Sequence, residues 1–300
     1  MIKNQPILSL CLPTNGAVHW VIPTLEGIYA QGVDNSLFEV VITDNGEDSK
    51  LGEALKQYNH PNMRYIPTND SGFLNLMTAL KLGKGLYCKM LNHRSVLVPG
   101  ALQMMIDFIE LYQDNKPILY FSDGKSEGPE IISCPNLDSF VYEMHYRATW
   151  SGGVGVWQED LGKLDGLQLN ETFPQSALMF EIREESEYVI FNRKFQDMQN
   201  EDGKGGYDLF WAFAVEFPNI WQELLSKNKI KQETYDYVMK KMYGFVYRLY
   251  CQEVLHKSNH TFIIQNVGKS ISTYYGWRGY LRIVFEARKN QIKRKIKKLL

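Results

Sequence analysis

Short apolar runs and helix-like segments alternate about every 25 residues over the first part of this 300-residue chain. The apolar runs are Ile7–Pro13, Phe38–Thr43, Met63–Pro67, Leu86–Leu91 and Ile118–Ser122. The segments between them have helical spacing: His19–Gln31, Leu51–Tyr58, Phe73–Leu82 and Ala101–Tyr112. Such alternation predicts an α/β fold with a mostly parallel sheet and helices on both faces.

The alternation fades after residue 125. We expect one more apolar strand at Val154–Trp157, a helix at Ser176–Glu185 and a polar, glycine-rich loop at Asn200–Gly206. Residues 207–260 are predicted to be mainly helical. With 44% hydrophobic residues the chain can fill a sizeable core. No run of the sequence approaches the roughly 20 apolar residues that cross a membrane as a helix.

Charge is distributed unevenly along the chain. Residues 269–300 carry ten Lys and Arg residues against one acid, Glu286, so the rest of the chain is acidic although the net charge is only −1. An acidic main part argues against general nucleic-acid binding, and we predict no nucleic-acid partner. The C-terminal tail is a separate, basic segment.

Polar residues follow the predicted strands where each one ends. Thr14-Asn15 follows the first strand, Asp44-Asn45 the second, and Asn69–Gly72 the third. The carboxyl ends of parallel strands lie side by side, and ligands of open α/β sheets bind in the crevice beyond them. A buried Asp there can accept a hydrogen bond from a pyrimidine N3–H or a ribose hydroxyl. The alternative is that these are ordinary turn residues.

Several common sites are excluded by their missing motifs. The chain has no phosphate loop of the Gly-x-x-x-x-Gly-Lys-Ser/Thr type, and no Gly-x-Gly-x-x-Gly follows the first strand. It has no Gly-x-Ser-x-Gly elbow, which disfavours an α/β-hydrolase. Its four cysteines show no Cys-x-x-Cys spacing, and we expect them to be reduced, buried thiols.

Four segments resemble family 2 glycosyltransferases of the GT-A fold. They are LSLCLPTN from Leu8, VVITDNGED from Val40, NDSGFLNLMTALKLGKGLY from Asn69 and FPQS from Phe173. The third and fourth are similar to the abequosyltransferase-like subgroup of surface-polysaccharide enzymes, in which an Asn stands ten residues before the Gly of a Gly-x-Tyr. Asn75 stands before Gly85 in this way. The resemblance covers roughly residues 6–180.

The resemblance implies a domain plan and a set of site residues. Residues 1–206 would form the GT-A domain, with the nucleotide-sugar half at about 1–125 and the acceptor half at about 126–206. A helical region, 207–268, and a basic amphipathic tail, 269–300, would follow. The implied donor-binding residues are Pro13, Thr14, Asn15, Asp44, Asn69, Gly72, Asn75, Asn92, His93 and Arg94, and the acceptor-binding residues are Trp150 and Gln175.

One position departs from the family pattern. The family carries an Asp-x-Asp signature after the fourth strand, where its carboxylates hold the ribose and a divalent cation, whereas here His93, Arg94 and Ser95 are aligned. Hard cations prefer oxygen ligands, above all carboxylates. We therefore assign no metal ligands, although Mg or Mn remains open. Either Arg94, with Lys89, replaces the metal by binding the leaving phosphate, or the site has lost catalysis.

The general base is the least defined part of the predicted site. Inverting enzymes of this family use an Asp or Glu near the acceptor. Glu171 is the nearest carboxylate to the FPQS segment, and Asp208 follows the glycine-rich loop. Both are candidates for the catalytic base, against the alternative of a surface or helix-capping role. His256 and His260 have the i, i+4 spacing of a metal pair, but a helix end is the simpler interpretation.

The tail predicts a membrane contact. In Arg288–Leu300, the apolar residues Ile292, Ile296 and Leu299 form a narrow stripe among seven basic residues, as in helices that lie on anionic lipid. The overall prediction is a cytoplasmic glycosyltransferase, peripheral at the inner face of the cell membrane. It would move a sugar from a nucleotide-sugar to a saccharide or lipid-linked acceptor in bacterial surface-polysaccharide synthesis. The alternative is an inactive, glycosyltransferase-like binding subunit.

Overall fold

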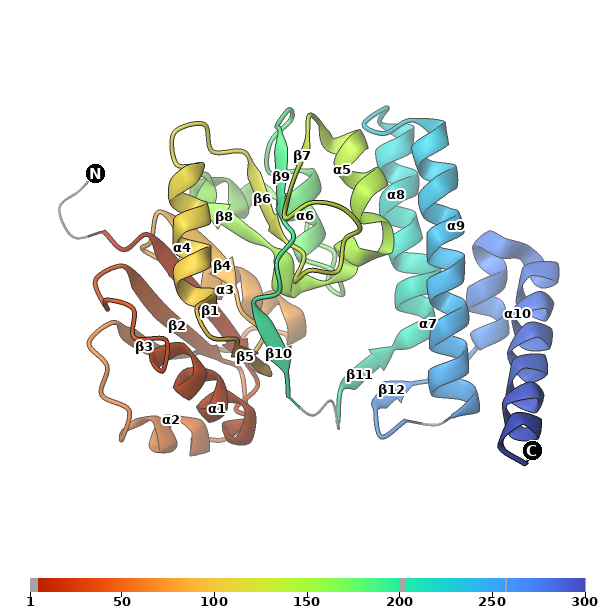
Figure 1. Ribbon diagram of the computed structural model, residues 1–300, viewed down its shortest axis with the longest axis horizontal. Coiled ribbons are helices and arrows are strands. Elements are labelled where there is room, and N and C mark those ends of the chain that lie inside the picture. Colours follow the sequence, from red (N-terminus) through yellow and green to blue (C-terminus); the bar gives the residue numbers. More distant parts are fainter. Residues whose placement is uncertain (1–4, 200–202, 257, 300) are drawn as a thin grey trace. The chain divides into compact units, whose positions relative to one another are not determined.

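The computed structural model describes residues 5–199, 203–256 and 258–299, with side chains up to residue 293 in the last helix. The chain forms two compact units. The first contains residues 1–140 and 147–200, and the second contains residues 141–146 and 201–300. Each is described by itself below, with the labels of Figure 1.

A five-stranded sheet with the order β3-β2-β1-β4-β8 forms the centre of the first unit (Figure 1). Its strands are β1 (Leu8–Thr14), β2 (Phe38–Asp44), β3 (Met63–Pro67), β4 (Tyr87–Met90) and β8 (Gly155–Trp157). The first four are parallel, and β8 runs antiparallel beside β4. The register pairs Thr14 with Asp44 and Asp44 with Pro67, so three strands end at one level. The predicted mostly parallel α/β sheet is confirmed.

The central strands are buried on both faces, which explains why their sequences are almost continuously apolar. Leu10 and Leu12 of β1 and Val40 and Ile42 of β2 join one apolar cluster together with Leu25 of α1. The intervening residues of both strands face α3 on the other side of the sheet. The helices of this unit are α1 (Val18–Tyr29), α2 (Lys50–Leu55), α3 (Asn75–Lys81), α4 (Ala101–Leu111) and α6 (Gln175–Phe180), and α5 (Leu137–Met144) runs from it into the second unit.

Two smaller sheets complete the first unit. One has the order β6-β9-β7, from Ile118–Phe121, Tyr188–Phe191 and Ile131–Cys134, and the other pairs β5 (Ser95–Leu97) with β10 (Gln196–Met198). Among the described residues, 3₁₀ segments occur at Gly72–Leu74, His145–Thr149, Ser151–Gly153 and Gln158–Gly166, of which His145–Thr149 begins in the second unit.

The second unit is mainly helical, as predicted for residues 207–260. Its strands β11 (Gly205–Asp208) and β12 (Thr261–Ile263) pair with each other. Its helices are α7 (Leu209–Trp211), α8 (Phe217–Ser226), α9 (Gln232–Leu249) and α10 (Val267–Leu299), with π-helical segments at Ala212–Glu216 and Tyr250–Leu255. In the part of the chain that the structure describes, no helix has both the length and the apolar character to cross a bilayer.

Two predicted segments differ from the structure. The helix expected at Ser176–Glu185 ends at Phe180, and the chain beyond it is held by Arg183, whose guanidinium lies 2.6 Å from the Asp160 carboxylate. The prediction of a loop at Asn200–Gly206 is wrong at its end, because Gly205 and Gly206 begin β11. Residues 200–202 of this segment lie outside the described residues.

Candidate functional site

The carboxyl ends of β1, β2, β3 and β4 bring together most of the residues predicted to bind a donor. Thr14 and Asp44 are the last residues of their strands and are paired in register. The Thr68 amide donates to the Asp44 carbonyl (2.7 Å), and the Leu91 amide donates to the Cys11 carbonyl (2.8 Å). These bonds continue the strand pairing into the loops, so the side chains that follow are held on short, fixed connections.

Asp44 is the buried carboxylate of this edge, with 3% of its surface exposed. Its Oδ1 accepts from the Gly46 amide (2.8 Å) and its Oδ2 from the Tyr65 hydroxyl (2.8 Å). Burial, and then the negative charge of Asp44, raise the pKa of Tyr65 to about 12, so the phenol stays protonated and can donate. Each carboxylate oxygen can accept a second hydrogen bond, which leaves capacity for a ligand.

Close packing of the two loops beside Asp44 requires a glycine. A Cβ on Gly46 would lie 2.7 Å from the Asn15 carbonyl oxygen and 2.9 Å from Asp44 Oδ1. Gly16, with φ +81°, turns the first loop toward the same carboxylate. The Asp-Asn-Gly order after β2 therefore has a steric basis, since only a residue without a side chain permits this approach.

Asn75 connects three strand ends from the first turn of α3. Its side-chain amide donates to the carbonyls of Thr14 (3.2 Å) and Thr43 (3.0 Å), and its Oδ1 accepts from the Thr68 hydroxyl (3.1 Å). The buried amide thus positions the strand ends, and its predicted contact with a donor stays a prediction. The resemblance singled out this residue, but its bonds to the backbone could not be read from the sequence.

The other predicted residues of this edge are more open to solvent. Asn15, Asn69 and Gly72 are exposed, and Pro13 is half-buried. Asn45, which follows β2 but was not among the implied donor-binding residues, donates its side-chain amide to the carbonyls of Asp70 (2.9 Å) and Gly72 (3.2 Å). That pair of bonds holds the third loop beside the second. 

After β4, the triplet Asn92-His93-Arg94 folds against the end of β1. The Asn92 Oδ1 accepts from the Arg94 amide (2.9 Å), and His93 Nδ1 lies 2.8 Å from the Thr14 hydroxyl. Burial, assisted by the positive charge of Arg94 and by His19, lowers the pKa of His93 to about 4. The imidazole is therefore neutral at physiological pH, and Arg94 supplies the positive charge of this triplet.

The Arg94 guanidinium lies over an aromatic ring. Its guanidinium carbon is 3.4 Å from the centre of the Trp20 ring, within the range of a cation–π contact. Trp20 also lies beside His93, with ring centres 5.4 Å apart. The Arg94 carbonyl accepts from the Gln199 amide (2.8 Å), and the Gln199 side chain donates to the Trp20 carbonyl (3.0 Å). Trp20 and Gln199 were missed by sequence reasoning, because neither position carries a recognisable motif.

These residues do not suit a divalent cation. Where the fold family places carboxylates, the chain has the neutral His93, whose Nδ1 faces Thr14, and the cationic Arg94. Nowhere in residues 5–199, 203–256 and 258–299 do three His, Cys, Asp or Glu side chains gather closely enough to hold a metal. A hard cation would meet a positive charge here in place of its preferred oxygen ligands.

The predicted acceptor-side residues lie elsewhere in the first unit. Trp150 is half-buried, and the Lys125 ammonium lies 4.5 Å from its ring centre. Gln175 is buried, and its amide donates to the Thr149 carbonyl (2.8 Å), which fixes the start of α6 against the Trp150 loop. Glu171 is exposed four residues earlier.

Asp208, the second candidate base, begins a helix in the second unit. Its Oδ1 accepts from the Trp211 amide (3.0 Å), which makes it the N-cap of α7. The structural role anticipated as the alternative is thus present, and catalysis by Asp208 or Glu171 stays a prediction.

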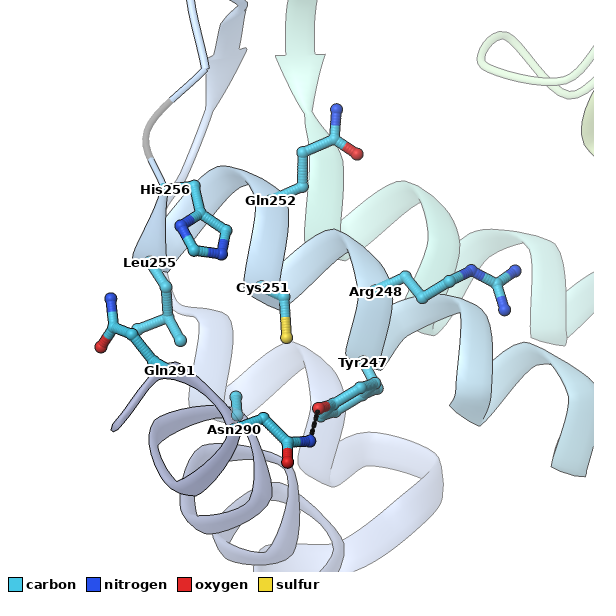
Figure 2. Close-up of a pocket in the computed structure, with 9 residues that line it drawn as sticks. Tyr247, Arg248, Cys251, Gln252, Leu255, His256, Asn290 and Gln291 are labelled. Carbon is cyan, nitrogen blue, oxygen red and sulfur yellow. Dashed lines mark hydrogen bonds between the residues drawn. The ribbon is translucent and has the colours of Figure 1, made fainter. Parts of the chain in front are cut away.

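His256 and His260, whose i, i+4 spacing was noted in the sequence, have different surroundings in the second unit. His260 Nδ1 lies 2.9 Å from a Glu253 carboxylate oxygen. His256 lines a pocket of about 270 Å³ together with Cys251 and residues of α10 (Figure 2). The alternative of a helix end is confirmed, since the π-helical segment ends at Leu255.

Comparison of the sequence with known proteins finds partial matches only, and no family model matches. An uncharacterized protein of Sinorhizobium fredii is 25% identical over 166 residues, which is 53% of this chain and 18% of that protein. Chondroitin synthase of Escherichia coli is 26% identical over 109 residues, 35% of this chain and 16% of the synthase. The chain therefore spans less than a fifth of the length of these curated relatives.

Comparison with solved structures aligns a larger share of this chain. S. aureus TarS 1–349 in complex with UDP-GlcNAc matches with a TM-score of 0.57 and 16% identity over 83% of this chain and 78% of that one. Mannosyltransferase PcManGT of Pyrobaculum calidifontis, in complex with GDP-Man and Mn²⁺, matches with a TM-score of 0.52 and 12% identity over 97% and 87%. The chain has the GT-A fold, and together these similarities support a glycosyltransferase family. The abequosyltransferase-like subgroup stays a prediction.

Proposed function

We propose that this chain is a glycosyltransferase that moves a sugar from a nucleotide-sugar to a saccharide or lipid-linked acceptor in the synthesis of a bacterial surface polysaccharide. The observation that carries the proposal is the convergence of Thr14, Asp44 and the Asn92–Arg94 triplet on one edge of the sheet. Neighbours of the same fold are described with UDP-GlcNAc, UDP or GDP-Man bound, which supports a nucleotide-sugar as the donor.

The chemistry of these residues suits the leaving group of such a reaction. Asp44, with its remaining acceptor capacity, would bind a base or ribose donor group. Arg94 would stabilise the negative charge that develops on the departing phosphate, because a guanidinium forms two parallel hydrogen bonds to phosphate oxygens. The neutral His93, paired with Thr14, would hold the loop on which Arg94 stands. A carboxylate, Glu171 or Asp208, would deprotonate the acceptor hydroxyl.

The proposal includes the location of the reaction. The basic tail would bind an anionic membrane surface, and the protein would act at the inner face of the cell membrane, where a lipid-linked acceptor is presented.

A second candidate, a catalytically inactive binding subunit, is favoured by one observation. His93, Arg94 and Ser95 stand where the fold family has the carboxylates of its Asp-x-Asp signature. A thermal-shift screen with UDP, GDP, CDP, CMP and dTDP, with and without Mn²⁺, identifies the nucleotide, because a ligand that binds the folded state raises its melting temperature. Donor turnover with that nucleotide's sugars then separates enzyme from binding subunit.

Nucleotide binding is expected to depend on Asp44. In Asp44→Ala the buried acceptor of a ligand hydrogen bond is lost, at a cost of about 1–3 kcal/mol, or about 5- to 150-fold in Kd. Isothermal titration calorimetry with the nucleotide from the screen measures this loss. Unchanged affinity in folded Asp44→Ala would remove Asp44 from the donor site.

Tyr65→Phe is the matched control for this variant. It removes the hydroxyl that donates to Asp44 Oδ2 but keeps the carboxylate. We expect its nucleotide affinity to fall much less than that of Asp44→Ala, since the carboxylate that would accept the ligand's hydrogen bond stays in place and the lost bond only positions it. Equal losses in both variants would mean that Asp44 acts only through its own internal bonds.

A further inference from the structure

The second half of α10 exposes four large apolar side chains on one face. Trp277, Leu281, Phe285 and Ile292 are 62%, 59%, 65% and 58% exposed. At 3.6 residues per turn these positions fall within about 80° around the helix axis, and they extend along about 22 Å of its length. Scattered exposed apolar residues are ordinary, but an aligned row of them, here called the apolar face, marks an interaction surface.

The helix is fixed in the second unit by its other side. Ile283 and Ala287 are buried, the Tyr243 hydroxyl donates to the Gly279 carbonyl (2.8 Å), and the Asn290 side chain donates to the Tyr247 hydroxyl (2.8 Å; Figure 2). Packing therefore determines which residues α10 shows to solvent, and the apolar face remains uncovered although the helix is firmly anchored.

A break in the helix sets where this face begins. Gly276 has φ 64° and ψ 168°, outside the helical range, and divides α10 just before Trp277. The Trp277 ring lies over Gly268 of the first half, where a Cβ would come within 3.2 Å of it. The glycine at 268 thus leaves room for the indole, which stays largely exposed while its inner edge is supported.

The charge around the apolar face is almost entirely positive. In the second half of α10, up to residue 293, the exposed basic residues are Arg278, Arg282, Arg288, Lys289 and Lys293. Four of the remaining residues up to Leu300 are also Lys or Arg, and Glu286 is the single acid from residue 269 onward. An apolar face bordered by cations is complementary to a lipid surface with anionic headgroups, where long basic side chains reach the phosphates while apolar ones enter the acyl boundary.

We infer that the second half of α10 docks flat on an anionic lipid bilayer through the apolar face, with Trp277 and Phe285 as its deepest residues. This surface begins well before the stripe predicted from Ile292, Ile296 and Leu299; the side chains of the last two lie outside the described residues. The biological role of this docking, which is to bring the protein to a lipid-linked acceptor, rests on the proposed function. Lipid binding itself is independent of sugar transfer.

Vesicle co-sedimentation of the full chain tests the docking. Wild-type protein is expected to bind vesicles of phosphatidylcholine with phosphatidylglycerol, to bind pure phosphatidylcholine weakly, and to be released as salt rises. The double variant Trp277→Ser, Phe285→Ser is expected to lower partitioning into anionic vesicles at least about tenfold. Point variants are preferable to a truncation at residue 268, which would also remove the buried Ile271, Ile283 and Ala287.

Leu111→Ser is the matched control, because Leu111 on α4 is 65% exposed like Phe285 but belongs to the part of the chain outside the basic segment 269–300. It should leave vesicle binding unchanged. An equal loss in this control, or no binding of wild-type protein to anionic vesicles at low salt, would overturn the inference. Self-association that Phe285→Ser abolishes, without vesicle binding, would assign the face to a second copy and overturn it too. Nucleotide affinity, measured on the same proteins, reports separately on the proposed function.

Discussion

Replacing Arg94 by Ala is expected to lower kcat/KM for sugar transfer by about 100-fold or more, the usual effect of removing a group that stabilises charge in the transition state. Arg94 is the cation of the triplet after β4, and the contact of its guanidinium carbon with the Trp20 ring, 3.4 Å from the ring centre, restrains the position of this group. Steady-state kinetics with the donor identified by the nucleotide screen measure the loss. Activity should largely survive EDTA, because the phosphate charge is balanced by the guanidinium.

Two variants sharpen this test. Arg94→Lys keeps the charge but loses the planar pair of donors, so we expect an intermediate loss of activity. Lys84→Ala removes an exposed cation before β4 and should leave activity unchanged. Full activity in Arg94→Ala, or complete loss of wild-type activity with EDTA that Mn²⁺ restores, would contradict a role for Arg94 in place of a metal.

The central strands β1 and β2 could be predicted from sequence because they are buried on both faces, which selects continuous apolar runs. The strand β3 is only half-buried, and its predicted bounds, Met63–Pro67, match the structure as well. The strands β5, β7, β9, β10, β11 and β12 were not predicted. They have three or four residues each, too few for an alternating pattern or a long apolar run to mark them.

For the candidate site, the location of some residues could be predicted from the sequence, but their hydrogen-bond partners could not. Asp44 and Thr14 could be located because a strand end is visible in sequence and parallel register aligns neighbouring ends. Their partners were not predictable: Tyr65 reaches Asp44 from the middle of β3, and Gln199 reaches the Trp20 carbonyl from 179 positions away. Such contacts depend on side-chain direction and tertiary packing, which no local pattern encodes.

Lys89 is a further case, since a lysine inside an apolar strand is visible in sequence but its environment is not. It is fully buried on the same face of β4 as Tyr87 and Leu91, so it does not reach the site edge. Its ammonium donates to the carbonyls of Met90 (3.0 Å) and Gly152 (2.8 Å). It also lies 4.8 and 4.5 Å from the ring centres of Phe121 and Phe195.

Burial lowers the pKa of Lys89 to about 7, although the charges of Asp123 and Cys11 would raise it. Burial also raises the pKa of Cys11 well above its usual value, so this thiol is neutral near pH 7. In the unfolded chain a lysine has a pKa of about 10.4. Between about pH 7 and 10 the unfolded state thus binds more protons at this position, and the free energy of unfolding must rise with pH there.

We therefore expect the stability difference between Lys89→Met and wild type to change by about 1 kcal/mol per pH unit between about pH 7 and 9, in the direction that favours wild type as pH rises. The carbonyls that lose their donor in the variant add a cost that does not depend on pH, so the slope is the readout. Urea unfolding at several pH values measures it, with Lys84→Met as the exposed control, for which a flat difference is expected. If the stability difference between Lys89→Met and wild type also did not change with pH, the Lys89 amine would have the same pKa in the folded and unfolded states. That result would contradict the lowered pKa expected from its burial.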